Sequence, residues 1–247
     1  MNEINLNEIE KMQQEQQEEI KNSMTNNKQQ LGIIGIPHMG LFHWQTIMSL
    51  LSLRMPNNTM VKYHFIGSSL VYDAREKIVE FAMNEKADWI FFLDSDMVPP
   101  HDILIKLTDL NVPMCTGMAF KRTPPFQPCF YTKVGVDKEF KPQLESPVEF
   151  PLQGIIECQG FGMACALIRR EVFEKVKKPY FFPFPNIGED LSFCLRARQA
   201  GFKMYCDLSV DCGHVSSMPI QKDHFKAAYE QYKKENNGEP LFKEEQL

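Results

Sequence analysis

Short apolar runs alternate with segments of helical periodicity through the first half of the chain. Residues 31–36, 61–66 and 89–93 form runs of five or six mostly apolar residues, which favours buried strands. Between these runs, residues 41–53 and the segment after Asp73 have apolar side chains at helical spacing. Strands that alternate with helices in this way predict parallel pairing and an α/β fold.

The helix after Asp73 has a predicted start signal. Asp73 and Glu76 match a D-x-x-E capping box, in which each side chain bonds a free backbone N–H at the helix start. Ala74, Ile78 and Ala82 then give the helix one apolar face. We therefore expect this helix to begin at Asp73 and to pack on the sheet.

The second half of the chain is less regular. We expect a helix over residues 102–109, followed by proline-rich loops near the site between residues 123 and 151. The pattern then predicts four strands and two helices, with Gly201 ending the second helix. The strands are expected at 155–157, 164–168, 204–206 and 210–212, and the helices at 170–177 and 189–200.

The expected domain organisation is one globular domain between two tails. A chain of 247 residues with 43% apolar side chains can bury one substantial core. Residues 1–30 are rich in Glu, Gln and Asn and are predicted to form a flexible or helical N-terminal tail. The domain is expected over residues 31–218, and residues 219–247 are predicted to form a C-terminal surface helix and tail.

Charge and cysteine content limit the possible partners and location. The net charge is -5 and no cluster of Lys and Arg stands out, so charge does not favour nucleic-acid or anionic membrane binding. The seven cysteines contain no C-x-x-C pair and lie mostly in apolar stretches, which indicates free thiols. With neither a signal peptide nor an apolar run near about 18 residues, we expect a cytoplasmic protein without a membrane span.

Two carboxylates, Asp94 and Asp96, directly follow the apolar run at residues 89–93. Carboxylate oxygens at the end of a strand could hold Mg²⁺ or Mn²⁺ against a diphosphate. Ligands of open α/β sheets bind beyond the carboxyl ends of the strands, where Pro37 and His38 also fall. Acidic residues are equally common as turn or capping residues after strands, so D-x-D alone leaves both interpretations open.

Two further acidic residues, Glu189 and Asp190, open a predicted helix. The functional interpretation is that Asp190 accepts the proton of an attacking hydroxyl as a general base, with Glu189 as the alternative base or an orienting residue. The other interpretation is an ordinary acidic helix start, stabilised by the helix dipole.

His214 stands at the end of the last apolar run. A lone histidine is usually structural, but with Asp94 and Asp96 it would complete an oxygen and nitrogen ligand set that manganese tolerates. A zinc site from Cys206, Cys212 and His214 is an alternative on ligand type, although its spacing matches no common zinc motif.

Five motifs follow one another in order over about residues 32–217. They are Asp73-Ala-Arg75, Phe92-Leu-Asp-Ser-Asp-Met-Val-Pro99, Gly160-Phe-Gly-Met-Ala-Cys165 with Leu167-Ile-Arg-Arg170, Gly188-Glu-Asp190 with Phe193-Cys194, and Gly213-His214. This series resembles the GT-A glycosyltransferases, and most of all the compact bacterial and phage enzymes near glycosyltransferase family 2. The resemblance implies a GT-A fold, which is a Rossmann-like mixed sheet flanked by helices, and a nucleotide-diphosphate sugar as donor.

The resemblance also implies roles for single residues. Asp96 would bind the metal directly, Asp94 would bind it through water or bind the ribose, and His214 would be the late metal ligand. Glu76 departs from the Asn that often follows the arginine in relatives. The residues implied to contact the donor are Pro37, His38, Asp73, Arg75, Asp94, Ser95, Gly160 and Gly162.

Glycine is suited to a close approach of backbone and sugar, but Gly160 and Gly162 also fit a bulge or tight turn. Lys121 and Arg122 could steady phosphate charge, or could simply be solvated.

The leading hypothesis is a glycosyltransferase of the hexosyltransferase type that needs Mn²⁺ or Mg²⁺ and inverts the anomeric carbon, with Asp190 as base. Alternatives are a retaining enzyme with the same metal ligands, a nucleotidyltransferase or phosphohydrolase, and a non-catalytic nucleotide-sugar binding protein. The acceptor could be a glycan, a protein or a modified DNA base.

Overall fold

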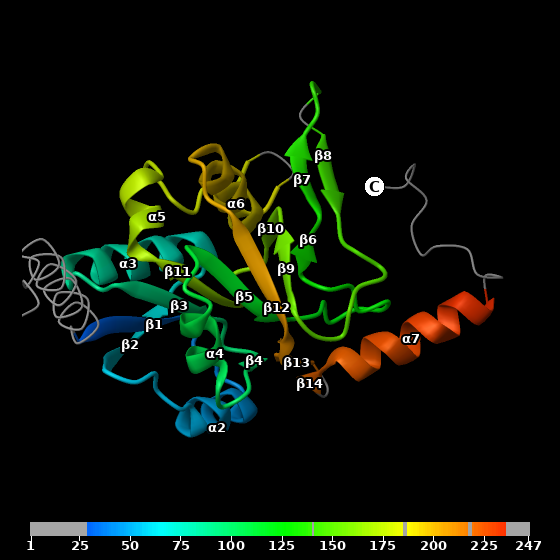
Figure 1. The fold of residues 1–247 in the computed structure, drawn as a ribbon, viewed down its shortest axis with the longest axis horizontal. Helices are drawn as coiled ribbons and strands as arrows, with labels where there is room; N and C mark the ends of the chain where they lie inside the picture. Colours follow the sequence, from blue (N-terminus) through cyan, green and yellow to red (C-terminus); the bar gives the residue numbers. More distant parts are fainter. Residues whose placement is uncertain (1–28, 140, 185–186, 217–218, 236–247) are drawn as a thin grey trace, which may run out of the picture.

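A seven-stranded mixed sheet forms the centre of the molecule (Figure 1). The structure is a computed structural model that describes residues 29–139, 141–184, 187–216 and 219–235. The sheet has the order β2-β1-β3-β11-β5-β12-β9, in which β11 and β9 run against the other five strands. Its strands are β1 Gln30–His38, β2 Thr59–Gly67, β3 Trp89–Leu93, β5 Met114–Met118, β9 Ile155–Cys158, β11 Cys165–Arg169 and β12 Met204–Asp211.

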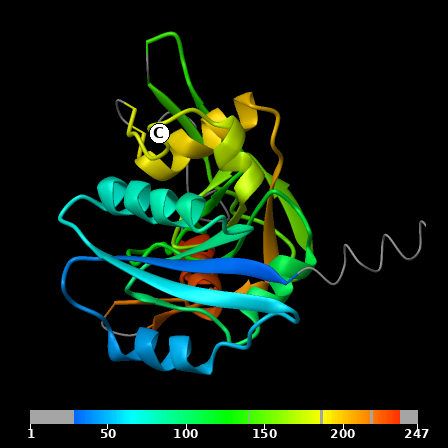
Figure 2. The same cartoon turned by 90° about the vertical axis from the view of Figure 1, so that its left-hand side faces the viewer.

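Helices cover both faces of the sheet (Figures 1 and 2). Side chains of α3, α5 and α6 enter one apolar core, and side chains of α2 and α4 enter a second core on the opposite face. β3 supplies both cores, because Ile90 and Phe92 face the first and Trp89, Phe91 and Leu93 face the second. The helices are α2 Trp44–Ser52, α3 Val71–Asn84, α4 Ile103–Asp109, α5 Arg170–Lys175 and α6 Glu189–Gln199.

Three small strand groups flank the sheet. β14, β13 and β4 pair in that order, and this pairing sets His214 opposite Met97. β10 pairs with β6, and β7 forms a hairpin with β8. Their bounds are β4 Met97–Val98, β6 Phe130–Tyr131, β7 Lys133–Val136, β8 Pro142–Glu145, β10 Gly160–Phe161, β13 Gly213–Val215 and β14 Pro219–Ile220.

The last described helix, α7 Lys222–Glu235, packs on this region through aromatic rings. The ring of Phe225 lies 5.4 Å from that of Phe120 and 5.7 Å from that of Phe150, measured between centroids. Residues 1–28 and 236–247, which hold most of the two predicted tails, lie outside the described residues. Among the helices that the structure describes, none is long and apolar enough to cross a membrane.

Most predicted strands and helices are present within two residues of their expected bounds. The prediction that Asp73 and Glu76 form a capping box at the start of α3 is wrong. α3 begins at Val71, and its N-cap residue Leu70 makes no side-chain capping bond. Asp73 instead bonds Ser68 and Lys77, while Glu76 accepts a hydrogen bond from the backbone N–H of Phe181. Glu76 is thus used to fix a distant loop rather than the start of its own helix.

Two other expectations also need correction. The strands predicted at 204–206 and 210–212 form one strand, β12, whose pairing with β5 shifts register between Asp207 and Asp211. The segment expected to be loops between residues 123 and 151 contains β6, β7 and β8, and β5 was missed altogether. β5 reads Met-Cys-Thr-Gly-Met, in which Thr116 is the one β-branched residue, so its composition gives little indication of a strand.

Gly32 on β1 makes room for Trp89 on β3. A Cβ atom at Gly32 would lie 2.1 Å from the Trp89 ring, which is fully buried. We expect Gly32→Ala to lower the free energy of unfolding by about 1–3 kcal/mol, because an overpacked core must shift its backbone or rings. Urea unfolding measures this change. Gly135→Ala is the matched control because nothing lies within 4 Å of its added Cβ, and equal loss in both variants would contradict the prediction.

Candidate active site

The predicted site residues gather at the carboxyl edge of the sheet. β1 ends at His38 and β3 leads into Asp94, while the antiparallel strand β11 begins at this same edge just after Gly162. The backbone N–H of Val215 donates to the carbonyl of Asp96 at 2.8 Å, which holds together the two loops that carry the predicted metal ligands Asp96 and His214. Sheet topology therefore brings together residues that are far apart in the sequence.

A cleft of about 460 Å³ opens at this edge, within the usual size range of small-molecule sites. It contains six of the candidate residues named from the sequence, Pro37, His38, Asp94, Ser95, Asp96 and Arg122, and the loop after β2 adds Ser68 and Ser69. Its lining is Pro37, His38, Met39, Leu41, His43, Ser68, Ser69, Val71, Asp94, Ser95, Asp96 and Arg122. The two serines were not predicted, and their only sequence signal is a Gly-Ser-Ser segment after an apolar run.

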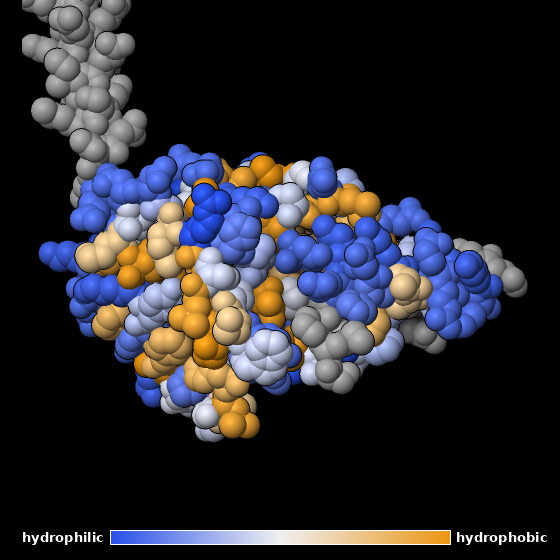
Figure 3. All heavy atoms as spheres, turned by 90° about the horizontal axis from the view of Figure 1, so that it is seen from below, coloured by the Kyte–Doolittle hydropathy of each residue, from blue (hydrophilic) through white to orange (hydrophobic). Residues whose placement is uncertain are grey.

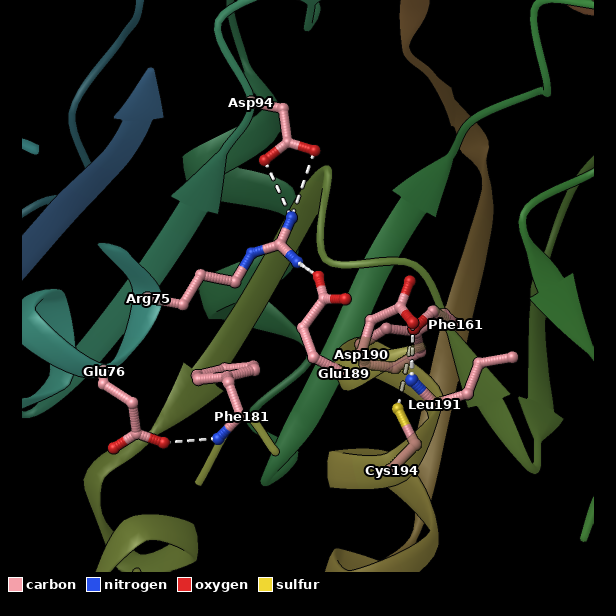
Figure 4. A network of polar contacts seen from close by, with 9 residues as sticks. All are labelled: Arg75, Glu76, Asp94, Phe161, Phe181, Glu189, Asp190, Leu191 and Cys194. Carbon is pink, nitrogen blue, oxygen red and sulfur yellow. Dashed lines mark hydrogen bonds and ion pairs between the residues drawn. The ribbon is translucent and has the colours of Figure 1, made fainter. Parts of the chain in front are cut away.

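Arg75 is the centre of a buried ion-pair network (Figure 4). Its Nη2 lies 2.9 Å and 3.1 Å from the two carboxylate oxygens of Asp94, and its Nη1 pairs with Glu189. Only 4% of its side chain is exposed. Burial disfavours its charge, but Asp94, Glu189 and Asp190 outweigh that effect and raise the pKa of Arg75. The guanidinium thus stays charged and neutralises two acidic side chains of the site.

Asp96 and His214 form the second cluster. His214 Nε2 lies 3.4 Å from Asp96 Oδ2, and Arg122 Nη1 lies 3.1 Å from that same oxygen. Burial opposes ionisation of Asp96, but His214 and Arg122 outweigh it and lower the pKa of this carboxyl group. Asp96 is therefore an anion across the neutral pH range.

The other nitrogen of His214 is fixed by the backbone. Nδ1 lies 2.7 Å from the carbonyl oxygen of Phe120, a contact in which the nitrogen donates. In the neutral ring this contact selects the tautomer whose Nε2 carries a lone pair on the Asp96 side, whereas Nε2 of the charged ring donates to Asp96. A divalent cation fits this arrangement because it satisfies the nitrogen lone pair and the carboxylate together.

No group of three or more His, Cys, Asp or Glu side chains within the described ranges is placed to hold a metal ion. Asp94, the third predicted ligand, is bonded to Arg75. The chain itself thus offers Asp96 and His214 as a pair, and the zinc alternative does not fit. Cys206 lies in the core on one face of the sheet and Cys212 in the core on the other.

Asp190 is not bonded to Arg75 in the network of Figure 4, in contrast to Asp94 and Glu189. One of its oxygens accepts from the backbone N–H of Leu191 at 2.7 Å. Burial raises the pKa of Asp190 to about 6, and the neighbouring Glu189 carboxylate adds to the rise. A partly buried carboxyl group with this pKa can take up a proton near neutral pH.

The remaining predicted residues have mixed positions. Gly162 lies beside Asp190, since an added Cβ would be 3.6 Å from Asp190 Oδ2. An added Cβ at Gly160 would be 2.9 Å from Val134 and 3.2 Å from Leu191, so this glycine serves packing against α6. Asp73 is outside the cleft lining and bonds Ser68, which is part of it.

Comparisons with known proteins agree with this architecture. No protein-family model and no curated protein matches the sequence. The crystal structure of A197 from STIV superposes with a TM-score of 0.59 at 22% identity, covering 79% of this chain and 91% of that one. The crystal structure of GalNAc-T7 with UDP, GalNAc and Mn²⁺ gives a TM-score of 0.50 at 11% identity.

The second match covers 88% of this chain and 52% of GalNAc-T7, so the chain spans about half of that structure. TarS from S. aureus is also similar, with a TM-score of 0.43 at 11% identity over 73% of this chain and 58% of that one. The fold is that of the GT-A glycosyltransferases, as predicted. A closer relation to family 2 stays a prediction.

Proposed function

We propose that this protein is a glycosyltransferase that uses a divalent cation and a nucleotide-diphosphate sugar, and that it inverts the anomeric carbon. The observation that carries the proposal is the division of roles among four acidic side chains, of which Asp94 and Asp96 line the cleft while Glu189 and Asp190 lie near Arg75. Arg75 neutralises Asp94 and Glu189, which leaves an ionised Asp96 beside His214 and a separate Asp190 with a pKa of about 6. Two carboxyl groups whose pKa values are shifted in opposite directions can serve as metal ligand and as general base in one reaction.

Asp96 and His214 would hold the cation. Their oxygen and nitrogen donors suit Mn²⁺ better than Mg²⁺, which prefers oxygen alone. A bound cation would offset the charge that develops on the departing diphosphate. The Mn²⁺ and UDP present in the GalNAc-T7 structure support the same donor class for this chain.

The chain's own residues would carry out the rest of the reaction. Asp190 would accept the proton of the acceptor hydroxyl as its oxygen attacks the anomeric carbon. Glu189 would not act as the base, because it is paired with Arg75 and would fix the position of that guanidinium. Its negative charge also raises the pKa of Asp190. Arg122 is about half exposed, so it could leave its ion pair with Asp96 and bind a phosphate of the donor instead.

Donor binding provides the first test. We expect UDP or GDP to bind in the presence of Mn²⁺, and we expect Asp96→Ala and His214→Ala each to weaken that binding by more than about 100-fold. Loss of an outer-shell partner alone costs about 10–100-fold in metal affinity, and these residues are proposed as direct ligands. Isothermal titration calorimetry with and without Mn²⁺ measures the effect.

The matched control for His214 is His224→Ala on α7, which lies outside the cleft lining and should bind as wild type does. Binding that does not need Mn²⁺, or that survives in both site variants, would remove Asp96 and His214 as ligands. Release of UDP or GDP from a panel of nucleotide sugars then separates a transferase from a protein that only binds the donor.

A further inference from the structure

Helix α2 has its polar and apolar sides reversed. An ordinary surface helix buries its apolar stripe and exposes its polar face. The buried residues of α2 are Thr46, Ser49 and Leu50, and the Ser49 hydroxyl donates a hydrogen bond to the carbonyl of Pro99. The exposed stripe consists of Trp44, Ile47, Met48 and Leu51.

These four side chains have the i, i+3, i+4, i+7 spacing of a single helix face. Trp44 is 71% exposed and Leu51 is 77% exposed. No other described part of the chain covers this stripe. An apolar helix face with a hydroxyl-bearing inner side is therefore built to meet something outside the domain.

The apolar surface extends beyond α2. Met39 and Leu41 in the preceding loop are exposed, and the ring of Phe42 lies 5.7 Å from that of Phe65 on the edge strand β2. Tyr63 and Phe65 project on the same side of the sheet as Val61, which packs in the core beneath α2. Figure 3 shows apolar side chains gathered on this face of the molecule, seen from below. We call the set Met39, Leu41, Trp44, Ile47, Met48, Leu51, Tyr63 and Phe65 the α2 surface.

The charge around the α2 surface differs from that of the whole protein. The chain has 32 acidic residues and a net charge of -5, yet residues 31–72 contain no Asp or Glu. Arg54, just after α2, is exposed and makes no ion pair with any described residue. This segment therefore adds no negative charge that would repel an anionic lipid bilayer, and Arg54 at its rim can pair with the headgroups. Trp and Tyr, which this patch contains, favour the interface between lipid and water.

We propose that the α2 surface inserts into one leaflet of an anionic lipid bilayer, so that the protein binds membranes peripherally. Apolar burial supplies most of the binding, because a cluster of Lys and Arg is lacking in this segment. Met39 and Leu41 also line the cleft, so the mouth of the cleft would face the bilayer. The inference rests on exposure and charge and does not depend on the transfer reaction.

Tryptophan fluorescence gives a direct test with the full-length chain. The protein has two tryptophans, and Trp89 is fully buried, so Trp44 reports on the α2 surface. We expect vesicles of phosphatidylglycerol and phosphatidylcholine to shift the emission of Trp44 to shorter wavelength. The protein should also sediment together with these vesicles. The double variant Met48→Ser, Leu51→Ser should lower the partition coefficient at least about tenfold, because two side chains lose their apolar contact with lipid.

The matched control is Ile155→Ser on β9, at the opposite edge of the sheet. Ile155 is also exposed, at 57%, and its loss should leave partitioning unchanged. An emission spectrum that vesicles do not change, or partitioning equal in wild type and the double variant, would overturn the proposal. Self-association that the double variant abolishes, without vesicle binding, would assign the surface to a second copy of the chain instead. Calorimetric titration of UDP and GDP with Mn²⁺ should be unaffected in the double variant, which separates this result from a failure of the proposed function.

Discussion

Asp190→Asn should abolish sugar transfer while leaving the protein at least as stable as wild type at pH 7.5. The amide has the shape of the carboxyl group but cannot accept a proton from the acceptor. Removal of a general base lowers the rate by about 10²–10⁴-fold. Turnover in the presence of nucleotide sugar and acceptor, together with thermal unfolding of the same sample, measures both effects.

The stability part of this prediction follows from the sign of the pKa shift. Because the pKa of Asp190 is raised to about 6 in the folded protein, the folded state binds the proton more tightly than the unfolded chain does. The resulting stabilisation is complete below the unfolded pKa near about 4 and is lost as the pH rises through about 6. A shift of about two units corresponds to at most about 3 kcal/mol, so the Asn variant should gain stability over wild type between pH 4 and pH 7.

Asp102 on the surface near α4 provides a control of opposite sign. Burial opposes its ionisation, but Lys106 outweighs this and lowers its pKa. Asp102→Asn should therefore be less stable than wild type at every pH above about 4, the difference should disappear as the pH falls below about 4, and transfer activity should be kept in full. An Asp190→Asn protein that retains transfer, or that unfolds at neutral pH, would contradict the assignment of Asp190 as base.

Arg75→Met should lower the free energy of unfolding by about 3–5 kcal/mol. Removal of one partner from a buried ion-pair network leaves the other charges uncompensated, and here two carboxylates depend on one guanidinium. Urea unfolding at pH 7.5 measures the change. Arg170→Met, which breaks a more exposed pair with Glu174, should cost no more than about 1 kcal/mol.

A rescue experiment distinguishes lost charge balance from lost packing. In the triple variant Arg75→Met, Asp94→Asn, Glu189→Gln, all three charges are removed and most of the stability should return, because buried ion networks can often be replaced by neutral groups. The triple variant should remain inactive, since the proposed donor contact of Asp94 and the proposed orienting role of Glu189 are lost. A triple variant as unstable as Arg75→Met would indicate that the arginine acts through its contacts with neighbouring apolar side chains, such as the ring of Phe181.

Much of the fold could be predicted because its strands are short apolar runs. β3 was predicted with its exact bounds, and the strand-helix alternation indicated the parallel pairing of β1, β2 and β3. The antiparallel insertion of β11 between β3 and β5 could not be predicted, because strand order depends on contacts across more than 50 residues. β5 lacks a strand-like composition and is held by burial between its neighbours.

The site could be predicted in part. The D-x-D motif and the acidic helix start indicated candidate ligands and bases, with Asp190 preferred to Glu189 as base, but the sequence shows no physical distinction between the two. That distinction depends on Arg75, which lies 114 residues away from Glu189 and reaches it only in the folded chain. The contact between His214 and the Phe120 carbonyl was also beyond sequence analysis, since a backbone acceptor has no sequence pattern.

The position of Phe120 links His214 to helix α7. Its carbonyl oxygen fixes the ring of His214, and its own ring stacks on Phe225 of α7. A chain shortened from its C-terminal side past Phe225 should therefore bind the cation more weakly even though its core is still folded. For anyone who shortens or fuses this protein, the C-terminal helix belongs to the proposed cation site as much as Asp96 and His214 do.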